Sequence, residues 1–409
     1  MQRSALGNRN YLLYLAGNTI SLHGLWVYRV ALGWQAWQLT HSEFWVGVVA
    51  FTQFFPIVLF GPLFGVLTDR MDRRIASIAI NVISALIMTV LAALEVLGLV
   101  DIYLLCMLSL VQGIAEGAHT PARLALVPNL VPRHQLQSAM ATNSVVFNLS
   151  RFVGPAIAGV LIALFGAASA FAFNALSYLP VIAALIFIQV APFRQNEAAR
   201  GNLWQELRDG MRYVLANRSI RLLMALVAIA SLFGRGPLEL LPAFAESVFQ
   251  RGSTGLATLT SAAGGGAVVA GVVISQGFIR LRILWIAIAT AVIGCLIVVL
   301  GVTTQFWLGV ATVALLGFML TFCGVSAHVL LQSLIDDELR GRVSSLWGML
   351  AFGGTAFGGL IVGACASRWG LTVTTVTVGA LCMLITLRMA ERRARKSLSA
   401  GFGGPRSDL

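Results

Sequence analysis

Long apolar runs alternate with short polar segments along almost the whole chain. Runs such as 283–302 and 305–335 are each long enough to cross a hydrocarbon layer of about 30 Å as a helix. Charged residues, or turns rich in glycine and proline, divide the chain into twelve such runs. Some of these divisions are marked only weakly, so eleven membrane-spanning helices is the alternative count. The predicted helices span residues 11–39, 44–67, 75–98, 101–123, 137–164, 168–190, 219–247, 255–279, 282–302, 305–333, 342–366 and 369–388. This pattern predicts an all-α polytopic membrane protein.

The composition excludes several other classes of protein. The chain is 58% hydrophobic and 11% charged, whereas soluble proteins carry roughly 25% charged residues. Lys396 is the only lysine, so the chain has no GxxxxGK[ST] phosphate loop, and we expect no ATP-driven transport. The net charge of +12 does not predict a nucleic-acid partner, because the basic residues lie in short segments between apolar runs. The five cysteines show no metal-ligand spacing, and no metal or cofactor is expected.

The basic residues concentrate in alternate loops. The loops and tails on one side contain Arg70, Arg73, Arg74, Arg133, Arg194, Arg200, Arg208, Arg212, Arg218, Arg280, Arg282, Arg340, Arg342, Arg392, Arg393, Arg395 and Lys396. The loops on the other side contain Arg251 and Arg368. Because positive residues are retained on the cytoplasmic side, both termini are predicted to be cytoplasmic. The preference for arginine over lysine suggests a GC-rich bacterial genome, and hence a bacterial inner membrane.

The longest polar stretch divides the chain near its middle. Within residues 191–218, apolar residues recur at helical spacing (Trp204, Leu207, Met211 and Val214), which predicts an amphipathic helix on the inner leaflet. We therefore predict an N-terminal six-helix bundle over 1–190, a cytoplasmic linker over 191–218, a C-terminal six-helix bundle over 219–390 and a disordered tail over 391–409.

An internal repeat supports two related halves. Residues 131–166 and 335–370 each contain a charged loop, a helix start, a glycine-rich stretch and a final glycine. Six-helix halves related by an axis along the membrane normal are the major facilitator arrangement. The segment Gly65-x-x-x-Asp69-Arg70-x-x-Arg73-Arg74 also resembles the loop signature of the major facilitator superfamily, although Asp72 stands where the general pattern has glycine. The second-half counterpart, near Gly277 to Arg282, has arginines but no aspartate.

Longer segments are similar to one branch of that superfamily. They are LHGLWVYRVALGWQAWQLTHS (22–42), PARLALVPNLVPRHQLQSAMATNSVVFNLSRFVGPAIAGVLI (121–162), LPAFAESVF (241–249) and LLQSLIDDELRGRVSSLWG (330–348). The branch is the third drug/proton antiporter group, which includes enterobactin-type siderophore exporters and macrolide efflux proteins. The resemblance covers nearly the whole membrane region and implies a twelve-helix major facilitator fold. It does not identify a substrate.

The resemblance also assigns roles to two short motifs. In the loop signature, Asp69 would face the positive end of the helix that begins near Arg342 and would close the inner side. The alternative is that Arg70, Arg73 and Arg74 only obey the positive-inside rule. The segment Gly154-Pro155-x-x-x-Gly159 resembles the helix-5 motif of drug antiporters and favours export over uptake.

Charged and polar residues inside the predicted spans are candidates for the transport site, because a charge in a span costs several kcal/mol. The expected cavity residues are Trp26, Arg29, His119, Arg151, Arg235, His328 and Gln332. Glu116 is the first candidate for proton coupling and Glu239 the second, because a carboxyl group in an apolar cavity can exchange a proton. The alternatives are static ion pairs, either between Glu116 and Arg29 or Arg123, or between Glu239 and Arg235.

These observations predict a secondary transporter that exports a small organic molecule in exchange for protons. A siderophore-like molecule and an amphipathic drug are both open, and the intramembrane arginines favour an anionic or mixed-charge substrate. A lysophospholipid flippase of the same fold and a transporter-like sensor are the alternatives. The chain has no HExxH or GxSxG motif, so we expect no enzyme activity. The expected partners are the substrate, protons and the lipid bilayer, and the chain is expected to be monomeric.

Overall fold

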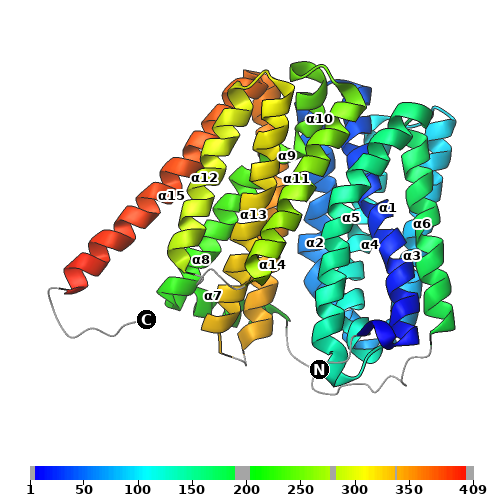
Figure 1. Cartoon of the computed structure of the whole chain (residues 1–409), viewed down its shortest axis with the longest axis horizontal. Coiled ribbons are helices and arrows are strands. Elements are labelled where there is room, and N and C mark those ends of the chain that lie inside the picture. Colours follow the sequence, from blue (N-terminus) through cyan, green and yellow to red (C-terminus); the bar gives the residue numbers. More distant parts are fainter. Residues whose placement is uncertain (1–4, 189–202, 277–281, 337–338, 402–409) are drawn as a thin grey trace.

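The computed structural model describes residues 5–188, 203–276, 282–336 and 339–401, and every regular element in these ranges is a helix (Figure 1). The first half contains α1 (Arg9–Thr40), α2 (Glu43–Arg70), α3 (Arg73–Val96), α4 (Ile102–Leu126), α5 (Leu136–Phe165) and α6 (Ala167–Phe187). The second half contains α8 (Arg218–Ile229), α9 (Gly236–Glu239), α10 (Leu241–Ala243), α11 (Gly252–Ser275), α12 (Ile283–Val302), α13 (Phe306–Leu334), α14 (Arg340–Trp369) and α15 (Leu371–Gly401). Short helices η1 (Ala5–Gly7), η2 (Val127–Asn129) and η3 (Arg133–Gln135) flank α1 and α5.

The seventh membrane span is not one regular helix. One π-helical stretch, η4 (Ala230–Arg235), lies between α8 and α9, and a second, η5 (Phe244–Val248), follows α10. In the described residues, eleven segments are long and apolar enough to cross a membrane, and this run forms one of them. The twelfth helix is α1, whose 32 residues reach about 48 Å at roughly 1.5 Å per residue. Polar residues such as Asn18 and Arg29 lower the hydropathy of α1.

Local capping explains where several helices begin. Asn8 Oδ1 accepts hydrogen bonds from the backbone N–H groups of Asn10 and Tyr11, at 3.0 and 3.2 Å. Asp72 Oδ1 accepts from Arg74 N at 2.8 Å and Ile75 N at 3.1 Å, so it caps α3. Such caps stabilise a helix by about 1 kcal/mol. The departure from the loop signature at Asp72 therefore has a structural role.

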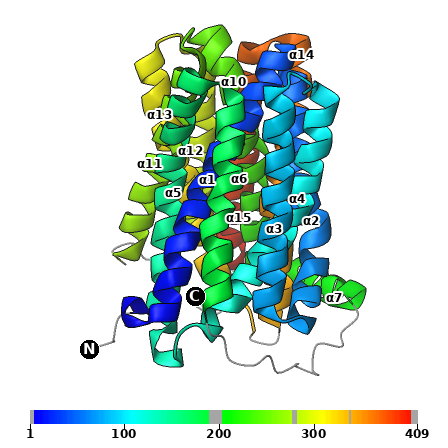
Figure 2. The ribbon, with the colours of Figure 1, turned by 90° about the vertical axis from the view of Figure 1, so that its right-hand side faces the viewer.

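The two halves lie side by side in Figure 1, and in Figure 2, which is turned by 90°, the first half stands in front of the second. The two sequence repeats correspond to α5 and α14, which contact helices of the opposite half. Each of these helices ends at a glycine with positive φ, 76° at Gly166 and 86° at Gly370. Large apolar side chains remain exposed on the outside, such as Val96, Leu164 and Phe187, as expected for a surface that faces lipid.

The linker helix α7 (Leu203–Ala216) packs against the second half. Gly210 lies against the side chains of Leu346 and Arg342 on α14. Arg342 Nη1 lies 3.5 Å from Asp209 Oδ2, and Tyr213 Oη donates a hydrogen bond of 3.2 Å to Asp336 Oδ2. The predicted amphipathic helix is therefore present, and one of its faces is covered by α14.

The end of the chain differs from the expected disordered tail. Helix α15 continues to Gly401, beyond residue 391 where disorder is predicted to begin. The segment 391–401 contains three arginines, two alanines and Lys396, which are strong helix formers. The prediction of disorder is therefore corrected for 391–401, and its remainder, residues 402–409, falls outside the described part of the chain.

Contacts between the halves gather at one end of the bundle. We call the end where α1 begins and α15 ends the terminal end, and the other the opposite end (Figure 1). Near the opposite end, α2 and α14 approach through glycines: a Cβ on Gly47 would lie 2.5 Å from Gly359 O, and one on Gly363 would lie 2.5 Å from Glu43 O. Gln38 Nε2 of α1 also donates a hydrogen bond of 2.7 Å to Glu246 Oε2 of η5. By contrast, a Cβ on Gly61 or Gly348, nearer the terminal end, would have no neighbour within 4 Å.

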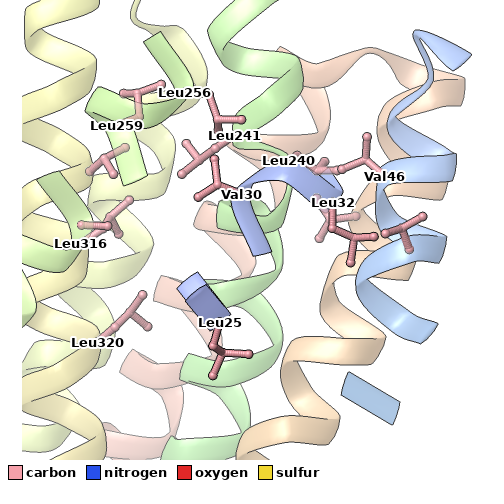
Figure 3. Close-up of a cluster of buried hydrophobic side chains, with 14 of the residues drawn as sticks. Leu25, Val30, Leu32, Val46, Leu240, Leu241, Leu256, Leu259, Leu316 and Leu320 are labelled. Atoms are coloured by element: carbon pink, nitrogen blue, oxygen red, sulfur yellow. The ribbon is translucent and has the colours of Figure 1, made fainter. Parts of the chain in front are cut away.

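A buried apolar cluster reinforces this closure (Figure 3). Val30 and Leu32 of α1 pack beside Leu240 and Leu241 of the second half, and each of these four side chains is at most 6% exposed. Because the cluster joins both halves, its burial stabilises the state that is closed at the opposite end.

The glycine contacts predict a specific conformational response. We expect Gly363→Val to disfavour the closed opposite end, because overpacking against the α2 backbone costs about 1–3 kcal/mol. That energy corresponds to a population shift of roughly 5- to 150-fold. Spin labels on cysteines at the exposed positions His41 and Ser247, with the native cysteines replaced, would measure the separation of the halves.

The matched control is Gly61→Val, on α2, where an added Cβ has no neighbour within 4 Å. We expect the label distance to lengthen in Gly363→Val and to stay at the wild-type value in Gly61→Val. An unchanged distance in Gly363→Val would contradict the proposed role of the glycines.

Candidate functional site

Three arginines from different elements meet between the halves. Arg29 lies on α1, Arg151 on α5 and Arg235 at the end of η4. Arg151 interacts electrostatically with Arg235 and Arg29, and all three interact with the carboxylate of Glu239 on α9. We call these four residues the arginine cluster. Each is partly accessible, although Arg151, Arg235 and Glu239 lie in segments apolar enough to cross a membrane and Arg29 lies within the long helix α1. The cluster holds two positive charges in excess.

Aromatic rings supply most of the close contacts in the arginine cluster. The guanidinium carbon of Arg29 lies 4.8 Å from the ring centre of Trp26 and 5.3 Å from that of Phe54. The guanidinium carbon of Arg151 lies 5.5 Å from the ring centre of Trp26. Trp26 therefore interacts with two guanidinium groups, each by a cation–π contact that contributes about 0.5–2 kcal/mol.

Polar atoms in this region lack partners. Among the described residues, Arg29 Nε and Trp26 Nε1 are buried without a hydrogen-bond partner. Unpaired buried donors are costly, which makes them candidates for binding a ligand or water. The local excess of positive charge favours a ligand that carries negative charge.

The predicted ion pair between Arg235 and Glu239 is not formed within 4.0 Å in the described residues, where the ion pair found is Arg342–Asp209. Arg235 ends the π-helical stretch η4, and Glu239 ends the short helix α9 that follows it. The two groups still interact electrostatically. Glu239 also packs against Gly359 of α14, with 3.6 Å between its Cβ and the position of a Cβ on Gly359.

Glu116 is placed apart from the arginine cluster. Its carboxylate interacts electrostatically with Tyr28, His119 and Tyr178, all in the first half. Within the described residues it forms no ion pair within 4.0 Å, so neither predicted static pair, with Arg29 or with Arg123, is present. Arg123 instead lies with its guanidinium carbon 5.7 Å from the ring centre of Phe147.

The remaining predicted cavity residues take other places. His119 lines a small pocket inside the first half. Gln332 Nε2 donates a hydrogen bond of 2.7 Å to Ser344 Oγ on α14 and lies 3.2 Å from His328 Nε2. The His328 ring lies 4.5 Å from the ring of Trp347, also on α14. His328 and Gln332 therefore reach α14 through their side chains.

The antiporter-like motif on α5 lies at close contacts between helices. Gly154 lies against Trp26, and Gly159 lies against Ala257 of α11, so the motif with Pro155 positions α5 between α1 and the second half. Gly264 on α11 lies against the α5 backbone at Arg151 and Phe152. Small residues at such positions permit close helix packing.

In the loop signature, Arg74 Nε donates a hydrogen bond of 2.6 Å to Leu185 O, at the C-terminal end of α6. Arg73 Nη1 donates one of 3.3 Å to Asn129 Oδ1. Gly65, Asp69 and Arg70 lie in the last turns of α2, and the side chains of Asp69 and Arg70 are outside the described ones. The predicted contact of Asp69 with the start of α14 stays a prediction.

Two aromatic residues near the charges were missed in the sequence. Phe54 contacts Arg29, and Phe147 lies with its ring centre 6.0 Å from that of Trp26. Phe147 precedes Arg151 by one helical turn, so helical spacing could have placed the two residues on the same face of α5. Phe54 lies on a different helix from its partner, and no local pattern indicates the contact.

Comparisons with known proteins agree with this architecture. Residues 6–400 match the family model described as transmembrane secretion effector, of the major facilitator type. The chain is 25% identical to macrolide efflux protein A of Streptococcus pyogenes, covering 91% of this chain and 93% of the relative. It is 24% identical to the staphyloferrin A transporter of Staphylococcus aureus, covering 93% and 96%.

Among solved structures, the chain resembles a bacterial homologue of the human lysosomal transporter Spinster, in an inward-facing and unoccupied conformation. The TM-score is 0.73 at 14% identity, covering 96% of this chain and 98% of that one. This likeness supports the fold alone. Taken with the nearly full-length family match, the twelve helices and the paired bundles, it leads to one conclusion: the chain belongs to the transmembrane secretion effector family of efflux-type major facilitator transporters.

Proposed function

We propose that this protein is a proton-driven exporter of small organic anions, siderophore-like or amphipathic, that works by alternating access. The observation that carries the proposal is the arginine cluster, in which three guanidinium groups face one carboxylate between the halves. A cationic drug would meet this excess of positive charge unfavourably, whereas an acid with an aromatic or apolar body would match the guanidinium groups and Trp26.

In this proposal the terminal end is cytoplasmic, as the distribution of basic residues predicts. The contacts that join the halves at the opposite end then make this the inward-facing state. The anion enters from the cytoplasm and displaces Glu239 as the counter-ion of the arginines. The halves then rock about the bound anion, and the site opens outward.

The return step uses the proton. We assign the proton to Glu116, whose carboxylate interacts electrostatically with Tyr28 and Tyr178 of the first half. Protonation from the outside and release to the cytoplasm would bias the empty carrier toward the inward-facing state. Glu239 is the second candidate for this role.

The test is substrate-induced proton release from acidified everted vesicles that contain a pH-sensitive dye. The panel comprises iron-free catecholate and carboxylate siderophores, macrolides, lipophilic cations and lysolipids. We expect the anionic siderophores to dissipate the gradient. A response to lipophilic cations alone would contradict an anion site, and transfer of lysolipids without proton movement would favour the flippase.

Arg29→Gln tests the anion site. We expect it to weaken binding of the transported anion by roughly 10- to 100-fold, because a hydrogen bond to a charged group contributes about 1.5–3 kcal/mol. The measurement is the concentration of anion that gives half-maximal dye response. Arg251→Gln is the matched control, because Arg251 is exposed and lies over Phe306 away from the cluster. Equal affinities for the anion in the two variants would show that the arginine cluster does not bind the substrate.

Glu116→Gln separates proton coupling from substrate movement. We expect this variant to exchange labelled anion across the membrane without a gradient at the wild-type rate, within about twofold, because the arginine cluster is intact. Dye response should be lost, since the amide cannot carry the proton. If Glu116→Gln still releases protons and Glu239→Gln does not, the proton site is Glu239.

A further inference from the structure

A small polar pocket lies inside the first half, away from the arginine cluster. Its lining comes from α1, α3, α4 and α6. The polar members are Tyr14, Asn18, Ser77, Asn81, His119 and Arg123, and Ala122, Val181 and Leu185 complete the wall. The pocket has room for about one water molecule. Within a bundle of apolar helices, such a concentration of polar side chains requires an explanation.

Asn81 supplies an independent sign that the pocket holds a ligand. Its side chain is 2% exposed, and its Nδ2 donates a hydrogen bond of 2.7 Å to Ser77 O on its own helix. Its Oδ1 is buried and has no hydrogen-bond partner among the described residues. A buried amide oxygen without a donor is costly, and a pocket of this size and polarity suits a water molecule that donates to it.

His119 connects this pocket with Glu116. The two residues are three positions apart on α4, so they lie on neighbouring turns of one helix face, and they interact electrostatically. The charged or titratable groups that face His119 are Glu116 and Arg123 on α4 and Tyr14 on α1. The α3 wall contributes the neutral Ser77 and Asn81, and the α6 wall is apolar.

We propose that the pocket holds water and that His119 transfers the proton of Glu116 into it, so that the first half has a proton exit separate from the anion site. This inference rests on the proposed function. The O–H bond of Glu116 breaks and an N–H bond forms on the neutral imidazole. The imidazolium then releases the proton of its other ring nitrogen to the pocket water, which becomes hydronium and leaves a Glu116 carboxylate and a neutral His119. The hydronium passes its proton to bulk water at the terminal end, because Tyr14, Ser77 and Leu185 of the pocket wall lie near the ends of their helices on that side.

A separate exit for the proton matters because the anion and the proton would otherwise pass through the same opening between the halves. In the inward-facing state the anion must enter from the terminal end while the proton leaves toward the same end. An anion at the arginine cluster would occupy the space beside Trp26, so a proton that left through the same space would compete with it. The pocket among α1, α3, α4 and α6 lets release continue while the anion binds.

Nitrogen NMR of histidine tests the pocket without a substrate. The full-length protein in liposomes, labelled with ¹⁵N-histidine, has five histidines, and the difference from His119→Gln identifies His119. We expect magnetisation exchange between the His119 ring N–H and water, reduced at least tenfold by Asn81→Leu, which fills the pocket. Asn148→Leu is the matched control, because Asn148 makes the same bond to the carbonyl four residues earlier, 2.8 Å to Ser144 O, outside the pocket.

Unchanged signals from the other four histidines in Asn81→Leu would show that the fold is intact. Water exchange at His119 that is equal in wild type and Asn81→Leu would overturn the proposal, as would the same loss in Asn148→Leu.

The vesicle assay supplies the functional arm. Using the iron-free siderophores as probes, we expect His119→Gln to slow proton release at least tenfold and to leave anion exchange without a gradient within about twofold of wild type. His23→Gln is the control, because His23 is bound by Thr19 O and Ser150 away from the pocket. Equal loss of exchange and proton release in His119→Gln would make His119 a structural residue and overturn the exit. Anion exchange without proton release in wild type would instead overturn the proposed proton coupling, and the exit with it.

Discussion

A positive charge inside a membrane-spanning helix must have water, a counter-ion or an aromatic face beside it. Three helical segments of this protein carry an arginine at such a position. All three arginines interact with the single carboxylate of Glu239, and two of them, Arg29 and Arg151, also contact Trp26. Because one carboxylate cannot neutralise them, the space between the halves must remain polar or hold an anion. A transporter needs a site of this kind, accessible from one side at a time.

The closed end of the bundle is built from residues that permit separation. Gly47, Gly359 and Gly363 bring the backbones of α2 and α14 together without interlocking side chains. Gly159 and Gly264 do the same for α5 and α11. Halves joined through small residues can part without extracting large side chains from pockets, and the apolar cluster around Leu240 and Leu241 supplies the opposing stabilisation.

The linker is structurally part of the second half. Asp209 and Tyr213 of α7 contact Arg342 and Asp336 at the start of α14, and Gly210 lies against that helix. The second-half loop near Gly277 to Arg282 lacks the aspartate of the first-half signature. A carboxylate from the linker thus pairs with an arginine at the start of α14, which holds the linker to the half that it precedes.

The sequence by itself determined the helices, because the signals that define them are local. Apolar length, the caps at Asn8 and Asp72 and the terminal glycines of the repeat act within a few residues of one another. The family motifs likewise lie within short segments. Export as the broad function therefore followed from the sequence, and the family match agrees with it.

Only the tertiary structure decided which charges meet. Arg29 and Arg151 share Trp26 across α1 and α5, a contact that no spacing along one helix specifies. The same helical spacing that suggested a cavity position for His119 turns this side chain into the first half, beside Asn81. Glu239 interacts with Arg29 and Arg151 of the first half as well as with Arg235, the one partner that helical spacing predicted. The direction of a side chain around its helix axis depends on helix rotation, crossing and local unwinding, and these are set by packing between distant segments.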